Sequence, residues 1–395
     1  MTGALRTLRR PLSGRDPAEP HRASTPLELL FDLSFVVAVA TAAVELEHGI
    51  AGDHVGTAVG RYLTVFFAIW WAWMNFTWFA SAYDTDDVPY RLLTLVQMAG
   101  VLVLAAGVHD AFSGADFTLV TVGYVIMRVP LVAQWLRAAR DDPDRRPVAV
   151  RYALGVTVVQ LGWLLRLALP GGTWLVSFLV LAVADVAVPI WSERSGASTR
   201  WHPEHIAERY GLFTLIVLGE VILGATTAVQ AALTEEGAST TLLSVAAGGL
   251  LLVFGLWWAY FCRPAAEALR VDRSVAFLWG YGHYLVFAGI GALGAGLEVA
   301  TAAARHEAEV GGRTAALSVA VPVAVTLLVV GALQTRLAAG RAVLLRYAAA
   351  AALVLLAALL PLTPAVVAMG VAVGGLVTVE VVRDARARVG DGDAS

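Results

Sequence analysis

Glu220 is a carboxylate in the middle of a long apolar stretch, the run 208–230. It follows Glu208 by about twelve residues, or about 18 Å along a helix, which is too deep for a glutamate side chain to reach water. Gly219 and Gly224 would let a neighbouring helix or a solute come close. An ionisable residue at this depth in a membrane marks a functional site or an ion pair. The predicted chemistry is binding of a proton or a charged solute, and the alternative is a protonated glutamate hydrogen-bonded within the bundle.

Glu28 and Asp32 form a second acidic pair, at the start of the apolar run 27–45. Their spacing of four residues places both carboxylates on one face of a helix. The pair could reach water at the membrane surface, with Arg91 or another loop arginine as its partner. It could also face the interior of a helix bundle and bind an ion. The second interpretation is favoured for Asp32, which lies one turn deeper.

Arg128 is a basic residue near the middle of the apolar run 117–137. An arginine at that depth needs an acceptor, because lipid does not solvate its charge. The candidate acceptors are Asp185, Asp32 and Glu220. A structural salt bridge and a substrate-binding arginine both remain open. Asp185 and Glu380 are expected near cytoplasmic helix ends, where contact with interfacial water is the simpler interpretation.

The segment from His202 to Arg209 contains histidine and acidic residues at helical spacing, with His205 and Glu208 on one face. A metal site needs three or four ligands and a supporting second shell, which this segment alone does not provide. The start of a helix at the membrane surface is favoured, because Pro203 and acidic residues suit a first turn. We therefore expect no metal and no cofactor.

The chain contains two similar halves. A shift of about 190 residues places Asp32 on Glu220, the Trp70-Trp71 pair on Trp257-Trp258, and Asp185 on Glu380. Such self-similarity predicts two copies of one unit. The predicted boundaries are an N-terminal tail 1–25, a first repeat 26–203, a second repeat 204–383 and a C-terminal tail 384–395.

The composition predicts an all-α integral membrane protein. Hydrophobic residues make up 58% of the chain and charged residues only 15%, against about 25% charged in average soluble proteins. The mean hydropathy is +0.71. Apolar runs of about 20 residues, the length that spans a bilayer, occur at twelve places. They are 27–45, 60–82, 90–108, 117–137, 150–169, 173–191, 208–230, 241–262, 275–298, 315–334, 343–361 and 364–382.

The arginines predict the orientation of these spans. If the N-terminus is cytoplasmic, Arg128 lies within a span and almost all of the other arginines fall on the inner side. The outer side receives only Arg61, Arg166, Arg305 and Arg313. Cytoplasmic loops are expected to carry this excess of positive charge. Twelve spans with both termini cytoplasmic follow, and six spans per half make the two repeats parallel.

With these residues described, the chain resembles the bacterial low temperature requirement A family of membrane proteins. The resemblance rests on Glu28-Leu-Leu-Phe-Asp-Leu-Ser-Phe-Val, on the segment from His205 to Glu220, and on Trp70-Trp71. It covers the chain from Pro26 to about Arg383 and implies a polytopic membrane protein. Leu30 is a mild departure from the family pattern. A more distant similarity is to the lysosomal potassium channels with a Phe-Ser-Asp motif, although Phe31-Asp32 here lacks the intervening serine.

The expected function is that of a secondary transporter in the bacterial cytoplasmic membrane. In this interpretation Glu220, Asp32 and Arg128 bind a proton or a charged solute between the two halves. An ion channel and a non-transporting stress-adaptation protein are the alternatives. No catalytic motif is present, so we do not expect an enzyme. The expected partners are the lipid bilayer, a small solute or ion and possible second copies of the chain in a homodimer, but no nucleic acid.

Overall fold

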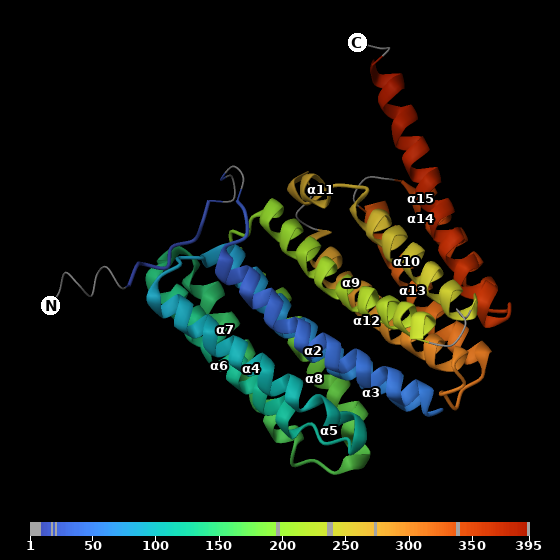
Figure 1. Cartoon of the computed structure of the whole chain (residues 1–395). Helices are drawn as coiled ribbons and strands as arrows, with labels where there is room; N and C mark the ends of the chain where they lie inside the picture. The colour runs from blue at the N-terminus through green and yellow to red at the C-terminus, as the bar shows by residue number, and fades with distance from the viewer. Residues whose placement is uncertain are drawn as a thin grey trace. The chain divides into compact units, whose positions relative to one another are not determined.

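The regular structure of this chain is helical throughout the residues that the computed structural model describes (Figure 1). These residues are 9–16, 19, 22–194, 198–234, 240–271, 275–336 and 340–392. Parts of the predicted tails 1–25 and 384–395 therefore lie outside the described residues. Contacts between residues divide the chain into two compact units. Unit 1 comprises residues 1–42 and 64–210, and unit 2 comprises residues 43–63 and 211–395.

Unit 1 contains the helices from α4 to α8 together with parts of three longer helices. The three longer helices continue into unit 2 and are α2 (Pro26–Ala51), α3 (Val55–Tyr83) and α9 (Pro203–Thr234). The helices wholly within unit 1 are α4 (Val88–Ala106), α5 (Val108–Ser113), α6 (Thr118–Asp141), α7 (Arg146–Arg166) and α8 (Trp174–Glu193). Two short 3₁₀ helices, η1 (Pro143–Arg145) and η2 (Gly171–Thr173), precede α7 and α8.

Unit 2 contains the remaining helices. They are α10 (Thr240–Phe261), α11 (Ala265–Val271), α12 (Ala276–Ala304), α13 (Gly312–Gln334), α14 (Arg341–Ala357) and α15 (Leu362–Gly392). Within this unit α12 packs against α13, and α10 packs against α15.

Eleven helices in the described part of the chain are long and apolar enough to cross a membrane. They correspond to eleven of the twelve predicted spans. The remaining span, predicted at 343–361, is α14, which has only 17 residues, the lower limit for crossing a bilayer. It ends at Ala357, four residues before Pro361, which has no N–H to donate to the carbonyl oxygen of Ala357. Twelve spans and two parallel repeats therefore remain predictions.

Glycines set the helix packing that supports unit 1. A Cβ on Gly123 of α6 would lie 2.4 Å from the backbone nitrogen of Leu104 on α4, and a Cβ on Gly100 would lie 2.8 Å from the Gly123 carbonyl oxygen. Such contacts let backbones approach closely, as is common in membrane helix pairs. The aromatic core of α3 is also in this unit, with Trp70 and Trp71 no more than 1% exposed.

The repeated tryptophan pair does not have one environment. Trp257 and Trp258, the predicted counterparts of Trp70 and Trp71, are 43% and 45% exposed. Exposed tryptophans on a membrane helix can contact lipid, whereas the pair in α3 fills the protein interior. Equal sequence positions in the two halves therefore do not imply equal packing.

Candidate functional site

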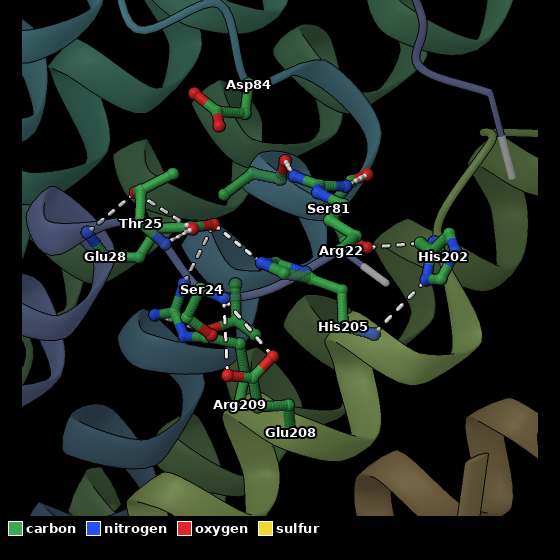
Figure 2. A network of polar contacts seen from close by, with 12 residues as sticks. Arg22, Ser24, Thr25, Glu28, Ser81, Asp84, His202, His205, Glu208 and Arg209 are labelled. Atoms are coloured by element: carbon green, nitrogen blue, oxygen red, sulfur yellow. Dashed lines mark hydrogen bonds and ion pairs between the residues drawn. The ribbon is translucent and has the colours of Figure 1, made fainter. Parts of the chain in front are cut away.

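The start of α2 is closed by a capping box that also orients Glu28. The backbone N–H of Thr25 donates to Glu28 Oε2 at 2.8 Å, and its hydroxyl donates to the same oxygen at 3.0 Å. The Glu28 N–H donates in return to Thr25 Oγ1 at 3.3 Å. This reciprocal arrangement satisfies helix N–H groups that otherwise have no partner, and Pro26 suits the first helical position. Because Oε2 is engaged by the cap, Oε1 is left to contact other elements (Figure 2).

The start of α9 is positioned by His202. Its ring nitrogen Nδ1 accepts a hydrogen bond from the His205 N–H at 3.3 Å, just inside the helix that begins at Pro203. The His202 N–H donates to the hydroxyl of Ser81 at 3.0 Å, which attaches this turn to the end of α3. With its start held in place, α9 presents His205 and Arg209, four residues apart, on one face.

These two helix starts bring four ionisable side chains together in unit 1, which we call the buried charge cluster: Glu28, Asp32, His205 and Arg209. His205 Nε2 lies 3.0 Å from Glu28 Oε1, and Arg209 Nη1 lies 3.2 Å from the same oxygen. Arg209 also binds Asp32 through two bonds, Nε to Oδ2 at 2.9 Å and Nη2 to Oδ1 at 2.5 Å. Two parallel bonds of this kind fix both distance and orientation. All four residues are at most 1% exposed.

Helix α3 completes the cluster from a third direction. Trp73 Nε1 donates to Asp32 Oδ1 at 2.6 Å, and the hydroxyl oxygen of Thr77 accepts from Arg209 Nη2 at 3.3 Å. His205 Nδ1 and the hydroxyl of Tyr90 are among the buried polar atoms that have no hydrogen-bond partner within the described residues. Buried polar atoms without partners are uncommon and cost free energy.

The four side chains of the cluster include two carboxylates and one arginine. A second arginine, the buried Arg22, lies close enough to Glu28 and His205 to interact with them electrostatically. In a low-dielectric interior an uncompensated charge is strongly unfavourable. The contact between His205 and Glu28 places a titratable imidazole 3.0 Å from a buried carboxylate oxygen.

Arg22, Ser24 and Asp84, which lie outside the helices, cover this site. Both terminal guanidinium nitrogens of Arg22 donate to backbone carbonyls at the end of α3, those of Ser81 and Ala80, and burial lowers the Arg22 pKa. Asp84, in the loop after α3, has its pKa raised to about 6 by burial and by the charge of Glu28, against the opposing effects of Arg22 and Arg15. The exposed carboxylate of Glu208 accepts from the Ser24 N–H at 3.2 Å (Figure 2).

The structure corrects the surface interpretation of Glu28 and Asp32. These two residues do not pair with Arg91, which instead binds Asp86 at 2.7 Å on the surface. The predicted start of α9 is confirmed at Pro203, and His205 is fully buried within the protein. Only its neighbour Glu208 is exposed.

Arg209 is the member of the cluster that the sequence prediction missed. It was counted with the cytoplasmic arginines, although it is fully buried. A signal was available, because Arg209 follows His205 by four residues, as Asp32 follows Glu28. When two helix starts with such spacing pack together, the two acidic residues of one can contact the histidine and the arginine of the other.

Arg128 belongs to a separate ion pair, between α6 and α8. Its Nη2 lies 3.7 Å from Asp185 Oδ1, and it also donates to the Tyr124 hydroxyl. Trp163 Nε1 donates to Asp185 Oδ2 at 2.8 Å. The prediction that a carboxylate from another span holds Arg128 is thus supported, with Asp185 as the partner. Asp185 is 3% exposed, so the expectation that it contacts interfacial water was wrong.

Glu220 lies in the part of α9 that belongs to unit 2, whereas Asp32 and Arg128 belong to unit 1. Its side chain is half-buried and has no ion pair or hydrogen bond within the described residues, and its charged neighbour is another carboxylate, Glu298. The predicted close approach occurs at Gly224, where a Cβ would lie 2.8 Å from the Gly294 carbonyl oxygen of α12. It does not occur at Gly219, which has nothing within 4 Å among the described residues.

Glu380 is held by two arginines in unit 2. Arg263 Nη2 lies 2.7 Å from its Oε2, and Arg346 binds both of its carboxylate oxygens. Glu380 is 1% exposed, so the expected contact with interfacial water was wrong here too. Its position next to loop and helix-end arginines fits a packing role.

Two comparisons place the chain among known proteins. Residues 23–381 match the family described as bacterial low temperature requirement A protein (LtrA). The chain is also 30% identical over 297 residues to an uncharacterized protein of Rhizobium meliloti (strain 1021), an alignment that covers 70% of this chain and 69% of the relative. The match spans all of the helices except the end of α15. The chain therefore belongs to the bacterial low temperature requirement A family of membrane proteins.

Proposed function

We propose that this protein is a secondary transporter that binds and releases a proton or a small cation at the buried charge cluster. The observation that carries the proposal is the set of four ionisable side chains Glu28, Asp32, His205 and Arg209, which contact one another and are each at most 1% exposed. Ionisable residues inside membrane proteins are costly and are usually kept for ion pathways, proton relays and substrate sites.

The bonds of Arg209 suggest how such a site works. Asp32 is held by two bonds from Arg209 and one from Trp73, so it acts as a fixed anchor. Glu28 Oε1 is shared between His205 and Arg209, and loss of the proton from the His205 contact leaves this oxygen with Arg209 alone. Such a change in charge shifts the equilibrium between conformations that bury the cluster differently. Proton binding is thereby coupled to conformation.

The wider proposal keeps the architecture and partners expected from the sequence. It comprises twelve spans, with α14 as the eleventh, two parallel repeats, both termini in the cytoplasm, and a site in the cytoplasmic membrane for a small solute or ion. The arginine distribution supports the orientation. Glu220 and Glu298, two half-buried carboxylates in unit 2, are proposed as a second proton-binding group. A homodimer is part of the same proposal.

Flux measurements in proteoliposomes test the proposal. Purified protein is reconstituted with a pH-sensitive dye inside the vesicles, and small ions and charged metabolites are added outside in turn. We expect a solute-dependent proton flux that Glu28→Gln abolishes and Glu208→Gln preserves. Glu208 is the matched control because it is an exposed glutamate beside the same site. Absence of any solute-dependent flux in the wild type would contradict the transporter, and flux unaffected by Glu28→Gln would contradict the site.

A further inference from the structure

Two adjoining cavities lie inside unit 1, where the end of α7 meets the starts of α6 and α8. The larger has a volume of about 150 Å³ and is bounded by the segment around Asp116 and Thr118, by Arg166, and by Thr173 and Ser177 at the start of α8. The smaller, of about 30 Å³, is lined largely by aromatic side chains. Phe117 and Arg166 line both cavities. A cavity of about 150 Å³ is large enough for a benzene-sized molecule.

Arg166 is a buried cation without a counter-ion. It is 9% exposed, and no carboxylate of the described residues lies within ion-pair distance of it. Its Nε donates to Ser177 Oγ and its Nη2 to the Trp174 carbonyl oxygen, both at 3.2 Å. These two weak bonds leave most of its five N–H groups free.

Aromatic rings compensate the charge of Arg166 only in part. The guanidinium carbon lies 5.2 Å from the centre of the Phe117 ring and 5.8 Å from that of Trp163. Cation–π contacts contribute much less than a buried charge costs. A permanently charged guanidinium that lines a cavity can attract an anion from outside the chain.

The first turns of two long helices, α6 and α8, line the larger cavity. Helix α8 begins at Trp174 with no side-chain hydrogen bond from its cap residue Thr173, so its positive dipole end is not neutralised by a cap. Helix α6 begins at Thr118, whose N–H donates to Asp116 Oδ1 at 2.9 Å, and this exposed carboxylate offsets part of the positive end of α6. The start of α8 therefore adds to the attraction that Arg166 exerts on an anion.

We propose that this cavity binds an oxyanion, a phosphate or a carboxylate group, with Arg166 as its main ligand. The planar guanidinium matches two oxygens of such a group at once. Thr118, Thr173 and Ser177 line the same cavity, and the hydroxyls of Thr173 and Ser177 donate to the carbonyl oxygens of Pro170 and Trp174. The oxyanion is either the headgroup of a membrane lipid or a small soluble anion. The site is independent of the buried charge cluster and does not rest on the transporter proposal.

Binding of three related probes separates these sources. Full-length protein in a maltoside detergent is titrated with dioctanoyl phosphatidic acid, with dioctanoyl glycerol, which lacks the phosphate, and with soluble glycerol 3-phosphate. We expect phosphatidic acid to bind at least about tenfold more tightly than dioctanoyl glycerol, as one charge-assisted contact predicts. Equal binding of glycerol 3-phosphate identifies a soluble oxyanion as the ligand, and binding of the lipid alone identifies a headgroup.

Three variants test the assignment to Arg166. Arg166→Gln should weaken the binding of phosphatidic acid about tenfold. Ser177→Leu, which fills the cavity and keeps the charge of Arg166, should weaken it equally. Arg305→Gln is the control, because Arg305 is 39% exposed and already paired with Glu307 at 3.0 Å. If Arg166→Gln does not give a monodisperse protein, Ser177→Leu decides. Binding within twofold of the wild type in both site variants, or equal binding of the lipids with and without phosphate, overturns the proposal.

Discussion

At the scale of single residues, the main feature is how Arg209 holds two carboxylates at once. It makes two bonds to Asp32 and one contact to Glu28, and none of the three is exposed by more than 1%. Desolvation makes such a group costly, so its members depend on one another. Removing one partner leaves an uncompensated buried charge, which destabilises the folded protein more than the absence of both partners would.

Loss of Arg209 should therefore destabilise the protein strongly. Arg209→Gln leaves Glu28 and Asp32 without their cation, and we expect a loss of about 3–5 kcal/mol in the free energy of unfolding. Adding Asp32→Asn should restore part of it. Arg91→Gln, which breaks only a surface pair with Asp86, should cost less than about 1 kcal/mol. Thermal unfolding in detergent measures all of these variants, and equal losses for Arg209→Gln and Arg91→Gln would contradict the buried cluster.

Asp84 makes stability depend on pH. Its pKa in the folded protein is raised from 3.8 to about 6, first by burial, so the folded state binds more protons than the unfolded state between these values. Its contribution is fully present below about pH 4 and is lost as the pH rises through about 6. The loss is about 2–3 kcal/mol.

Comparison with Asp84→Asn isolates this effect, because asparagine does not titrate. Melting temperatures of both proteins are measured from pH 4 to pH 7.5. We expect the wild type to lose stability relative to Asp84→Asn across this range and to be the less stable protein at the upper end. A difference in melting temperature between the two proteins that stays constant with pH would show that the pKa of Asp84 is not raised.

At the scale of elements, helix caps and glycine contacts position the helices of unit 1. The capping box at Thr25 and the cap at His202 fix where α2 and α9 begin. Glycines in α4 and α6 let these two helices approach until their backbones nearly touch. Each device acts locally, yet each decides which face of a helix meets its neighbour.

Gly123→Ala should separate α4 from α6. Its new Cβ would lie 2.4 Å from the Leu104 nitrogen, a backbone atom that cannot rotate away. We expect a loss of about 1–3 kcal/mol, typical of overpacking. Gly60→Ala in α3 is the control, since nothing lies within 4 Å of the added atom among the described residues, and it should be neutral or stabilising by about 0.4–1 kcal/mol. Similar melting temperatures for both variants would contradict the close contact.

At the scale of the whole molecule, the proposed orientation follows from the arginines. Both termini and the loop around Asp144 are expected in the cytoplasm, whereas the segment around Glu307 is expected outside. Asp144 and Glu307 are both exposed and lie between predicted spans. They are suitable positions for labelling because substitution there disturbs no buried contact.

Cysteine labelling of intact cells tests this orientation. The single cysteine is first removed by Cys262→Ala, and Asp144→Cys or Glu307→Cys is then introduced. A membrane-impermeant maleimide should label the second variant in intact cells and the first only after the cells are opened. Labelling of Asp144→Cys in intact cells would contradict the predicted topology.

Much of the architecture could be predicted from the sequence because it depends on local rules. Long apolar runs predicted the helices, and eleven of the twelve were confirmed as long enough to span a membrane. The starts of α2 and α9 were predictable from Pro26 and Pro203 and the residues around them, since helix starts depend on neighbours within one turn. The spacing of Glu28 and Asp32 likewise predicted one shared face.

Only the tertiary structure decided which charges pair. Spacing along one helix determines the face that a side chain occupies, but not which other helix packs against that face. Asp32 therefore proved to bind Arg209, Arg128 proved to bind Asp185, and Glu220 proved to have no such cation among the described residues. The burial of His205 was not predictable for the same reason, since it depends on α2, a helix more than 150 residues earlier in the chain.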